Sequence, residues 1–581
     1  MVRLFVILAL TAFSLMGCDG PTAPEAPNIA PKARKSNLKA VAPWFVRIES
    51  EIGIDFSHET DRKHDHFMPD SMGSGAALFD LDNDGRLDIY ILQNAGEESK
   101  NTNRLYRQDD QGRFTDVSDT SGLNVAGYGM GVAVGDVNND GYIDVYVTEY
   151  GRSRLFVHNG GGAKPVYRDA TAAAGLESRL WGTSTSFVDF DRDGWLDLVV
   201  VNYLDYDPAR TCRDANGKRG FCSPSAFPGR VTRLYRNAGV LEGEPRFEDV
   251  TIRSGLAAQP GPGLGVYCAD FDGDSFVDIF VANDGKANRL WMNQRDGSFA
   301  DEAPLRGIGL NSMGKAEADM GIAIGDADGD GVFDIFVTHL TRETPTLWVQ
   351  KPRGMFRDHT MASGLGKPEW RGTGFGTVMV DFDHDGDLDL AVANGRVIRG
   401  QIPKKIDDDL DPFWHPYAQR DQLFANDGKG RFQDISTSND ALCGVATVSR
   451  GMATGDIDND GDMDLLVTTI GGRVRLLRNV APKRGHWLMV VAKDPALRRD
   501  AYGAEVMVIA SGRKRVQLVN PGYSYLCSND PRVHFGLGET KQVDAIEVAW
   551  PDGTRERFPG CAVDQQIELR KGEGQAIPKA E

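Results

Sequence analysis

The strongest constraint on the fold of this chain is an acidic nine-residue motif that occurs seven times. Its usual form is Asp-x-Asp-x-Asp-Gly-x-x-Asp, followed at once by an apolar run. The copies begin at Asp80, Asp136, Asp189, Asp270, Asp326, Asp381 and Asp456, between 53 and 81 residues apart. Carboxylates placed so close together repel one another unless a cation lies among them. Oxygen-only ligands in a flexible, crowded loop favour Ca²⁺ over Mg²⁺, so each copy predicts a calcium loop.

The twelfth position of the motif excludes an EF-hand. An EF-hand loop closes with a bidentate Glu at this position and lies between two helices. Here the apolar run after the ninth residue predicts a β-strand. The residues at position 12 are Ile91, Val147, Val200, Val281, Val337, Val392 and Val467.

Each motif belongs to a longer unit that predicts four short strands. A strand of small residues precedes the loop (131–136 and 321–326, for example), and an apolar strand follows it. A third segment (232–237) and a fourth (246–251) complete the unit. Seven repeats of four strands predict an all-β fold with a seven-bladed β-propeller.

The two ends of the repeat region predict how the ring closes. The last repeat stops at 474–479 without a fourth strand, whereas residues 44–56 resemble a fourth strand with no repeat before it. We expect this N-terminal strand to complete the seventh blade, because a shared blade removes exposed sheet edges.

The repeat resembles the FG-GAP/VCBS family of calcium-loop propellers, which includes the integrin α headpiece. The resemblance implies up to seven structural Ca²⁺ ions, held by the side chains of positions 1, 3, 5 and 9 and the carbonyl of position 7. Two positions depart from the pattern: Asn138 lacks a charge, and Ser275 replaces a turn glycine. The implied side-chain ligands are Asp80, Asp82, Asp84 and Asp88; Asp136, Asn138, Asp140 and Asp144; Asp189, Asp191, Asp193 and Asp197; Asp270, Asp272, Asp274 and Asp278; Asp326, Asp328, Asp330 and Asp334; Asp381, Asp383, Asp385 and Asp389; Asp456, Asp458, Asp460 and Asp464.

The repeat region, 44–481, gives way to a different pattern at residue 482. Short β segments separated by Gly and Pro predict a small all-β, sandwich-like domain over 482–575, with a tail at 576–581. The stretch GYSYLCSNDPRVHFGLG (522–538), with its neighbours, resembles the ASPIC/UnbV domain. The combination resembles the cartilage-acidic-protein-like family, which implies calcium binding and an extracytoplasmic surface role but no defined reaction.

The first 17 residues predict a lipoprotein signal peptide. A single charge, Arg3, precedes an apolar run that is too short to span a membrane. The run ends in Leu-Met-Gly-Cys, which resembles a lipobox, so Cys18 is expected to carry the lipid. Residues 18–43, rich in Pro and Ala, predict a tether. We therefore expect an exported lipoprotein on the periplasmic or cell-surface side, attached to the membrane by its N-terminal lipid alone.

Six further cysteines are compatible with disulfides in an exported chain. Cys212 and Cys222 lie in one polar insertion and are the best candidates for a pair. The sequence does not set the connectivity of Cys268, Cys443, Cys527 and Cys561.

The sequence contains few motifs typical of enzymes, so an enzymatic function is the less favoured hypothesis. There is no GxSxG, HExxH or CxxC motif, and residues 309–316 resemble a phosphate loop only until Ala316 replaces the required Ser or Thr. His64 and His66 form a pair without a third metal ligand in view. The net charge of −19 argues against a nucleic-acid partner.

Two insertions, 202–230 and 394–420, mark a candidate ligand face. Both fall between the second and third strands of a blade, and therefore on the face opposite the calcium loops. Binding residues often lie in such long loops on a rigid scaffold, although the insertions could equally be caps on the blades. The candidate ligand residues are Tyr203, Tyr206, Trp414, His415 and Tyr417.

Two functions follow from these observations. The leading one is a lipid-anchored, calcium-stabilised binding or adhesion protein with a protein or glycan ligand. The alternative is a carbohydrate-active enzyme resembling a polysaccharide lyase, for which Arg396, His415 and Tyr417 are the relevant residues. We also expect calcium removal to loosen the propeller before it affects the C-terminal domain.

Overall fold

The computed structural model describes residues 42–61, 66–160, 167–214, 217–368 and 370–578. The signal peptide, Cys18, His64 and all but the last two residues of the tether lie outside these ranges. Within them, no helix has both the length and the apolar character needed to cross a membrane.

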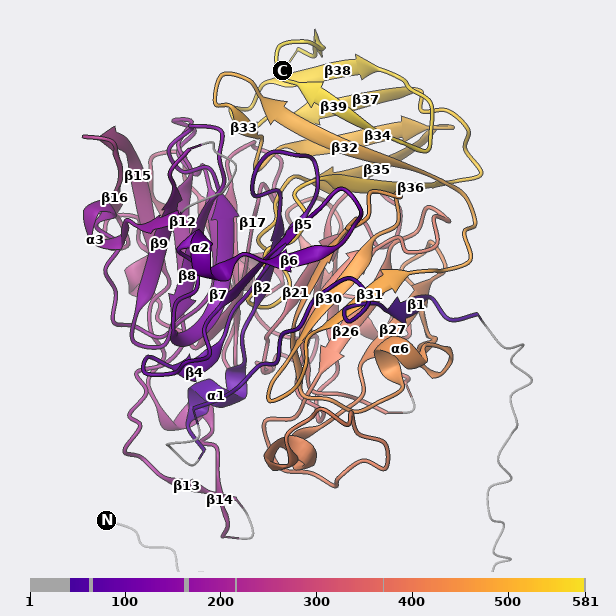
Figure 1. The fold of residues 1–581 in the computed structure, drawn as a ribbon. Coiled ribbons are helices and arrows are strands. Elements are labelled where there is room, and N and C mark those ends of the chain that lie inside the picture. The colour runs from indigo at the N-terminus through magenta and orange to yellow at the C-terminus, as the bar shows by residue number, and fades with distance from the viewer. Residues whose placement is uncertain (1–41, 62–65, 161–166, 215–216, 369, 579–581) are drawn as a thin grey trace, which may run out of the picture. The chain divides into compact units, whose positions relative to one another are not determined.

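Seven antiparallel sheets of the repeat region form the blades of a propeller, as predicted (Figure 1). Blade 1 contains β2 (Ala76–Phe79), β3 (Asp88–Ile91), β5 (Arg104–Gln108) and β6 (Phe114–Asp116); blade 2 contains β7 (Gly127–Gly135), β8 (Asp144–Glu149), β9 (Ser153–His158) and β10 (Tyr167–Asp169), with β4 (Asn94–Gly96) beside β7; blade 3 contains β11 (Gly182–Val188), β12 (Asp197–Asn202), β15 (Arg233–Leu241) and β16 (Glu244–Asp249). Blade 4 contains β17 (Gly263–Ala269), β18 (Asp278–Asn283), β19 (Arg289–Asn293) and β20 (Phe299–Asp301); blade 5 contains β21 (Ile322–Gly325), β22 (Asp334–Val337), β23 (Thr346–Gln350) and β24 (Phe356–Asp358); blade 6 contains β25 (Gly374–Val380), β26 (Asp389–Asn394), β27 (Gln422–Asn426) and β28 (Phe432–Asp434).

The seventh blade joins the two ends of the repeat region. It contains β29 (Ser449–Gly455), β30 (Asp464–Thr469), β31 (Arg475–Asn479) and the N-terminal strand β1 (Phe45–Arg47). β1 pairs antiparallel with β31, so that Phe45 lies opposite Asn479. The inner strands β2 and β29 also contact each other. The predicted closure of the ring by a shared blade is therefore confirmed.

Short helical turns and one small hairpin occupy the connections. The turns α2 to α5 follow the fourth strand of a blade, and each ends at a glycine with positive φ, such as Gly122 at 84°. The helices are α1 (Met68–Met72), α2 (Ser118–Ser121), α3 (Thr171–Ala174), α4 (Ala303–Arg306), α5 (Thr360–Ser363), α6 (Asp440–Cys443) and the 3₁₀ turns η1 (Pro224–Ala226), η2 (Leu256–Ala258), η3 (Pro412–Tyr417) and η4 (Ser436–Ser438); the hairpin is β13 (Cys212–Arg213) with β14 (Arg219–Gly220).

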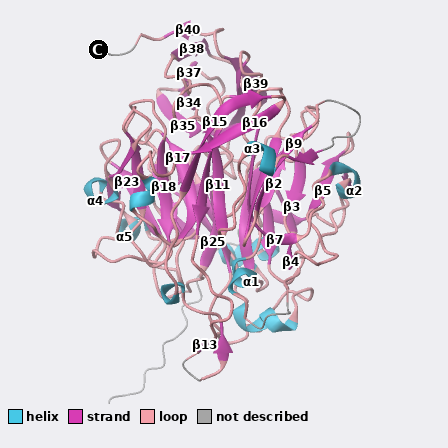
Figure 2. Cartoon of the chain, turned by 90° about the vertical axis from the view of Figure 1, so that its left-hand side faces the viewer, coloured by secondary structure: helices cyan, strands magenta, loops and turns pink. Residues whose placement is uncertain are grey.

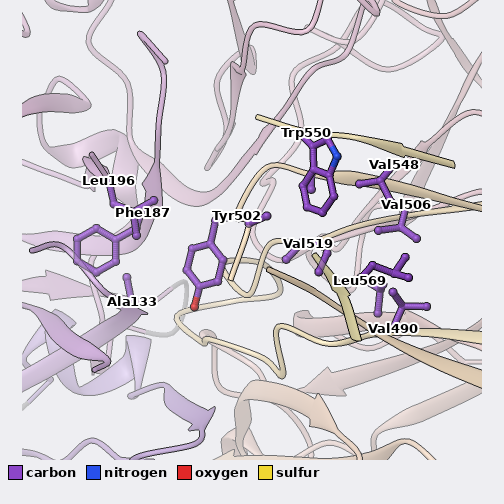
Figure 3. Close-up of a cluster of buried hydrophobic side chains, with 14 of the residues drawn as sticks. Ala133, Phe187, Leu196, Val490, Tyr502, Val506, Val519, Val548, Trp550 and Leu569 are labelled. Carbon is purple, nitrogen blue, oxygen red and sulfur yellow. The ribbon is translucent and has the colours of Figure 1, made fainter. Parts of the chain in front are cut away.

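The C-terminal residues form two further sheets. One contains β33 (Arg499–Asp500), β32 (His486–Asp494) and β36 (Val533–Gly538), with β39 (Gln565–Arg570) parallel to β32; the other contains β35 (Arg513–Leu518), β34 (Glu505–Ala510), β37 (Ala545–Ala549), β38 (Arg555–Pro559) and β40 (Gln575–Ala576). Side chains from both sheets, including Val490 and Val506, share one buried cluster, as expected for a sandwich. The same cluster continues through Tyr502 to Phe187 and Leu196 of blade 3 (Figure 3).

The connection from β35 to β36 lies in the centre of the propeller. We call residues 520–530 the channel segment, because they contact the inner strand of every blade. Backbone hydrogen bonds join Ser528 to Ala76 and Leu526 to Val132, and a Cβ on Gly75 would overlap the carbonyl oxygen of Leu526. The hydrogen-bond partners of the channel segment on the inner strands are Ala76 and Leu78, Val132, Ser184, Cys268, Ile322, Thr377 and Thr454.

Candidate calcium loops and the opposite face

The ninth residue of each acidic motif is a buried aspartate that ties its loop to the blade. It is the first residue of the second strand and is at most 2% exposed in all seven blades. Asp197 shows the pattern: Oδ2 accepts the amide of Phe190 in its own loop at 3.0 Å, and Oδ1 accepts the amide of Asn237 on the third strand at 2.7 Å. The same pair of hydrogen bonds recurs in the other six blades.

The first aspartate of the motif folds the loop back on itself. Asp136 accepts the amide of Asp140 at 3.1 Å and that of Gly141 at 2.8 Å. Ser275, which stands where the other loops have glycine, adopts a left-handed conformation with φ of 73° and donates its amide to Asp270 at 2.7 Å. The fourth loop therefore keeps the same hydrogen bond from position 6 to position 1 despite the substitution.

The carboxylates of the loops converge as a cation site requires. In at least five of them, oxygens of three aspartates lie within 4.8 Å of one another. Buried oxygens of Asp82, Asp189, Asp328 and Asp381 have no hydrogen-bond partner among the described residues. A buried acceptor without a donor, surrounded by like charges, is stabilised by a cation. The residues present thus fit bound Ca²⁺, which would contribute two positive charges to each loop.

The pKa values of the buried loop aspartates are raised in this environment. Burial, together with neighbouring carboxylates, raises the pKa of Asp88 and of Asp278 to about 8, against the effect of their backbone hydrogen bonds. Arginines reach only some of the outer oxygens: Arg107 pairs with Asp82 at 2.5 Å. Basic side chains also pair with aspartates of four other loops, but the ninth aspartates have no ion pair among the described residues, so their negative charge is left for a metal ion to balance.

The C-terminal domain covers the loop face, an arrangement that no sequence pattern indicates. Arg499 donates to Asn139 Oδ1 at 3.0 Å and to the Gly194 carbonyl at 3.2 Å. Arg532 donates to Asn459 Oδ1 at 2.6 Å and to the Asp456 carbonyl at 2.7 Å. Each arginine lies more than 70 residues from the loop that it contacts, and no sequence pattern predicts these contacts.

The two insertions meet on the opposite face of the propeller. Figures 1 and 2 show the hairpin β13–β14 at the end of the propeller away from β34 to β38. Cys212 and Cys222, the proposed pair, form a disulfide with Cα atoms 5.1 Å apart. Phe221 of the first insertion stacks on Trp414 of the second, with ring centroids 5.9 Å apart.

Three of the five candidate ligand residues point into the protein. Tyr203, Trp414 and Tyr417 are about 1% exposed, and Tyr203 donates its hydroxyl to Asp284 at 2.5 Å. Tyr206 and His415 are half-buried. Packing between the insertions buries Trp414 and Tyr417, whereas Tyr203 packs against Trp181. Any ligand would contact side chains exposed around these aromatic residues.

The residues considered for a lyase have separate partners in the structure. Arg396 donates to the carbonyls of Gln401 and Ala418, and the Tyr417 hydroxyl accepts from Arg399. The His415 ring lies 3.1 Å from the Leu410 carbonyl. Arg396 and Tyr417 are joined through their backbones, because the Arg396 amide donates to the Tyr417 carbonyl at 2.8 Å.

Comparison with known families identifies the chain. The FG-GAP-like repeat model matches residues 80–147, 136–200, 270–337 and 407–467, and the ASPIC and UnbV model matches residues 494–576. The chain is an FG-GAP repeat protein with a C-terminal ASPIC/UnbV domain. It is homologous to cartilage acidic protein 1. It is 24% identical over 515 residues to the Xenopus tropicalis protein (84% of this chain, 71% of that protein) and 24% identical over 521 residues to the Homo sapiens protein (84% and 70%).

Solved structures show weaker likenesses. An Agrocybe aegerita lectin that recognises non-reducing terminal N-acetylglucosamine is 15% identical, with a TM-score of 0.36 over 71% of this chain and 91% of that chain. A chain from the crystal structure of BBS1N in complex with ARL6DN is 10% identical, with a TM-score of 0.36 over 76% of this chain and 99% of that chain. These scores are too low to carry an inference about a ligand.

Proposed function

We propose that this protein is a calcium-stabilised, extracytoplasmic binding or adhesion protein, anchored by lipid at Cys18, that takes a protein or glycan ligand on its insertion face. The observation that carries the proposal is the set of buried loop carboxylates whose oxygens lack partners, at Asp82, Asp189, Asp328 and Asp381. Calcium in such loops fixes the ends of the blades and makes the propeller a rigid scaffold. A binding or adhesion role is compatible with the homology to cartilage acidic protein 1.

The position of the C-terminal domain favours the insertion face as the ligand side. That domain contacts the loop face through Arg499 and Arg532, whereas the insertions project from the other end of the propeller. The second insertion exposes the apolar side chains of Ile398 and Ile402, at 62% and 54%. Exposed apolar residues on long loops are suited to contact a partner.

The ligand test begins with a glycan array and a panel of surface proteins probed with the purified, calcium-saturated protein. A double variant, Ile398→Asp with Ile402→Asp, should lose at least about tenfold in affinity for any ligand found, while its melting temperature stays unchanged. Ile252→Asp is the matched control, because Ile252 is 87% exposed and lies outside both insertions. Equal binding by the double variant and the control would place the ligand site elsewhere.

The calcium test uses elemental analysis after extensive dialysis. We expect up to seven calcium ions per chain, and we expect chelation to lower the melting temperature. A protein that holds no calcium and melts at the same temperature in chelator would contradict the calcium part of the proposal without touching the ligand part.

A further inference from the structure

Four acid–base side chains converge at the end of blade 5 that lies away from its calcium loop. Glu317 and Asp319 precede β21, and His339 and Glu343 follow β22; we call these four residues the His339 cluster. The two strands pair antiparallel, with Ile322 opposite Val337, so the start of β21 and the end of β22 lie side by side. The acidic motif joins the same two strands at their other end.

Three carboxylates surround one imidazole nitrogen in this cluster. His339 Nδ1 lies 2.8 Å from Asp319 Oδ1 and 4.0 Å from an oxygen of each of Glu317 and Glu343. The His339 side chain is 0% exposed, and that of Asp319 is 5% exposed. The ring is therefore held in the interior with its Nδ1 directed at the acids.

His339 and Asp319 form a close ion-pair contact, with Nδ1 2.8 Å from Oδ1. Beyond this contact, neither ring nitrogen of His339, nor Asp319 Oδ1, has a hydrogen-bond partner among the described residues. Buried nitrogen atoms without partners are rare in folded proteins. A buried nitrogen and a buried carboxylate oxygen 2.8 Å apart are close enough for one ion to bind to both.

The remaining contacts hold the acids in place without neutralising them. Glu343 Oε2 accepts the amide of Ala318 at 3.0 Å, and Glu317 accepts the hydroxyl of Thr346 at 3.3 Å. Within the part of the chain that the structure describes, the ion pairs of these three carboxylates are with His339 alone. The cluster thus keeps excess negative charge in a largely buried site, which a divalent cation would balance.

We propose that the His339 cluster binds a divalent transition-metal ion through His339 Nδ1 and the carboxylates of Glu317, Asp319 and Glu343. Imidazole nitrogen with carboxylate oxygen suits Zn²⁺, Co²⁺, Mn²⁺ and Fe²⁺, whereas Ca²⁺ prefers oxygen alone. The protein would then carry two classes of cation site at opposite ends of its blades. This site is independent of the calcium loops and of the proposed ligand.

The test is a cobalt titration of the calcium-saturated protein, in which the acidic loops are already filled. We expect one equivalent of Co²⁺ to bind with a visible absorption band, and Zn²⁺ to displace it. His339→Gln should abolish the band. His486→Gln should retain it, because His486 pairs with a single carboxylate, with its Nδ1 2.6 Å from Asp564 Oδ2.

A second variant keeps the test informative if His339→Gln does not fold. Glu343→Gln keeps an oxygen that can accept the Ala318 amide, and Glu343 is 27% exposed, so we expect it to fold normally. It should weaken cobalt binding by more than about tenfold. The proposal is overturned if wild-type protein binds no Co²⁺ once its calcium sites are full, or if both variants bind it as tightly as wild type; an ion-paired histidinium would then explain the cluster.

Discussion

Ser524 and Ile322 exchange two backbone hydrogen bonds, each of 2.9 Å, across the boundary between the C-terminal domain and the propeller. Ile322 opens the inner strand of blade 5, and Ser524 belongs to the channel segment. The two regions therefore share backbone pairing as well as the buried cluster around Tyr502. Residues 42–581 accordingly form one compact unit.

This shared core changes the expected response to calcium removal. The sequence alone suggested that chelation would loosen the propeller first and leave the C-terminal domain intact. With the channel segment bonded to all seven inner strands, we expect one cooperative transition that moves to lower temperature in EDTA. At about ten times the Kd, each ion contributes roughly 1.4 kcal/mol, so seven independent sites contribute about 10 kcal/mol. Calorimetry that resolved two transitions, with the smaller one unmoved by chelator, would favour independent domains instead.

Truncating the channel segment should destabilise the whole unit. Tyr525 is fully buried, packs edge-on against Phe375 at 5.0 Å and donates its hydroxyl to the Met72 carbonyl at 3.3 Å. We expect Tyr525→Ala to cost about 3–5 kcal/mol in urea denaturation, in a single transition. The exposed Met313→Ala is the control. A variant as stable as wild type would mean that the channel segment adds little to the fold.

The buried ninth aspartate of a loop offers the sharpest test of the metal ligands. Asp197→Asn keeps nearly the same shape but replaces one of two oxygens that accept the amides of Phe190 and Asn237. We expect the loss of one calcium per chain in elemental analysis and a destabilisation of about 1–3 kcal/mol. Asp110→Asn, on the surface outside the motifs, should change neither quantity. An unchanged calcium count would remove Asp197 from the ligand set.

The blades could be predicted from the sequence because each repeat is local. The repeat period, the turn glycines and the apolar run after each ninth residue all lie within one unit. The last repeat lacks a fourth strand after 474–479, and the surplus strand at Phe45–Arg47 takes that place. The channel segment could not be predicted, because its partners lie on seven different strands with no shared spacing. The burial of Trp414 was missed for a related reason: an irregular loop has no periodicity to show which way a side chain points, and Phe221, which covers it, belongs to another blade.

The His339 cluster was missed because its four residues occupy two short segments without a motif. Glu317, Asp319, His339 and Glu343 meet only when β21 and β22 pair. In contrast, the seven acidic loops carry all their candidate ligands within nine residues. A sequence shows a site most clearly when the ligands are neighbours in the chain.

Glu149 gives the fold a specific pH dependence. It ends β8, is 2% exposed, and burial raises its pKa from 4.5 to about 7 despite Arg154, 3.4 Å away. Between these two values the folded state holds a proton that the unfolded state has lost, so stability falls as pH rises from about 4.5 to 7 and levels off above. Glu149→Gln removes this loss, so its stability relative to wild type should improve from pH 5 to pH 8 in urea denaturation. The exposed Glu177→Gln should show no such trend, and parallel pH profiles for Glu149→Gln and wild type would contradict the assignment.

Lipid attachment at Cys18 is the prediction that decides where the protein works. The apolar run before Leu15-Met16-Gly17-Cys18 is too short to span a membrane, and the run ends in a lipobox-like sequence. Radiolabelled palmitate should therefore enter the full-length wild type and not Cys18→Ser, and only the wild type should sediment with membranes. Cys561→Ser, which removes a partly exposed cysteine from the C-terminal domain, should be labelled like wild type. Equal labelling of all three proteins would show that the lipid, if present, is carried by another residue, and the membrane-anchored part of the proposed function would fall while its calcium and ligand parts remained.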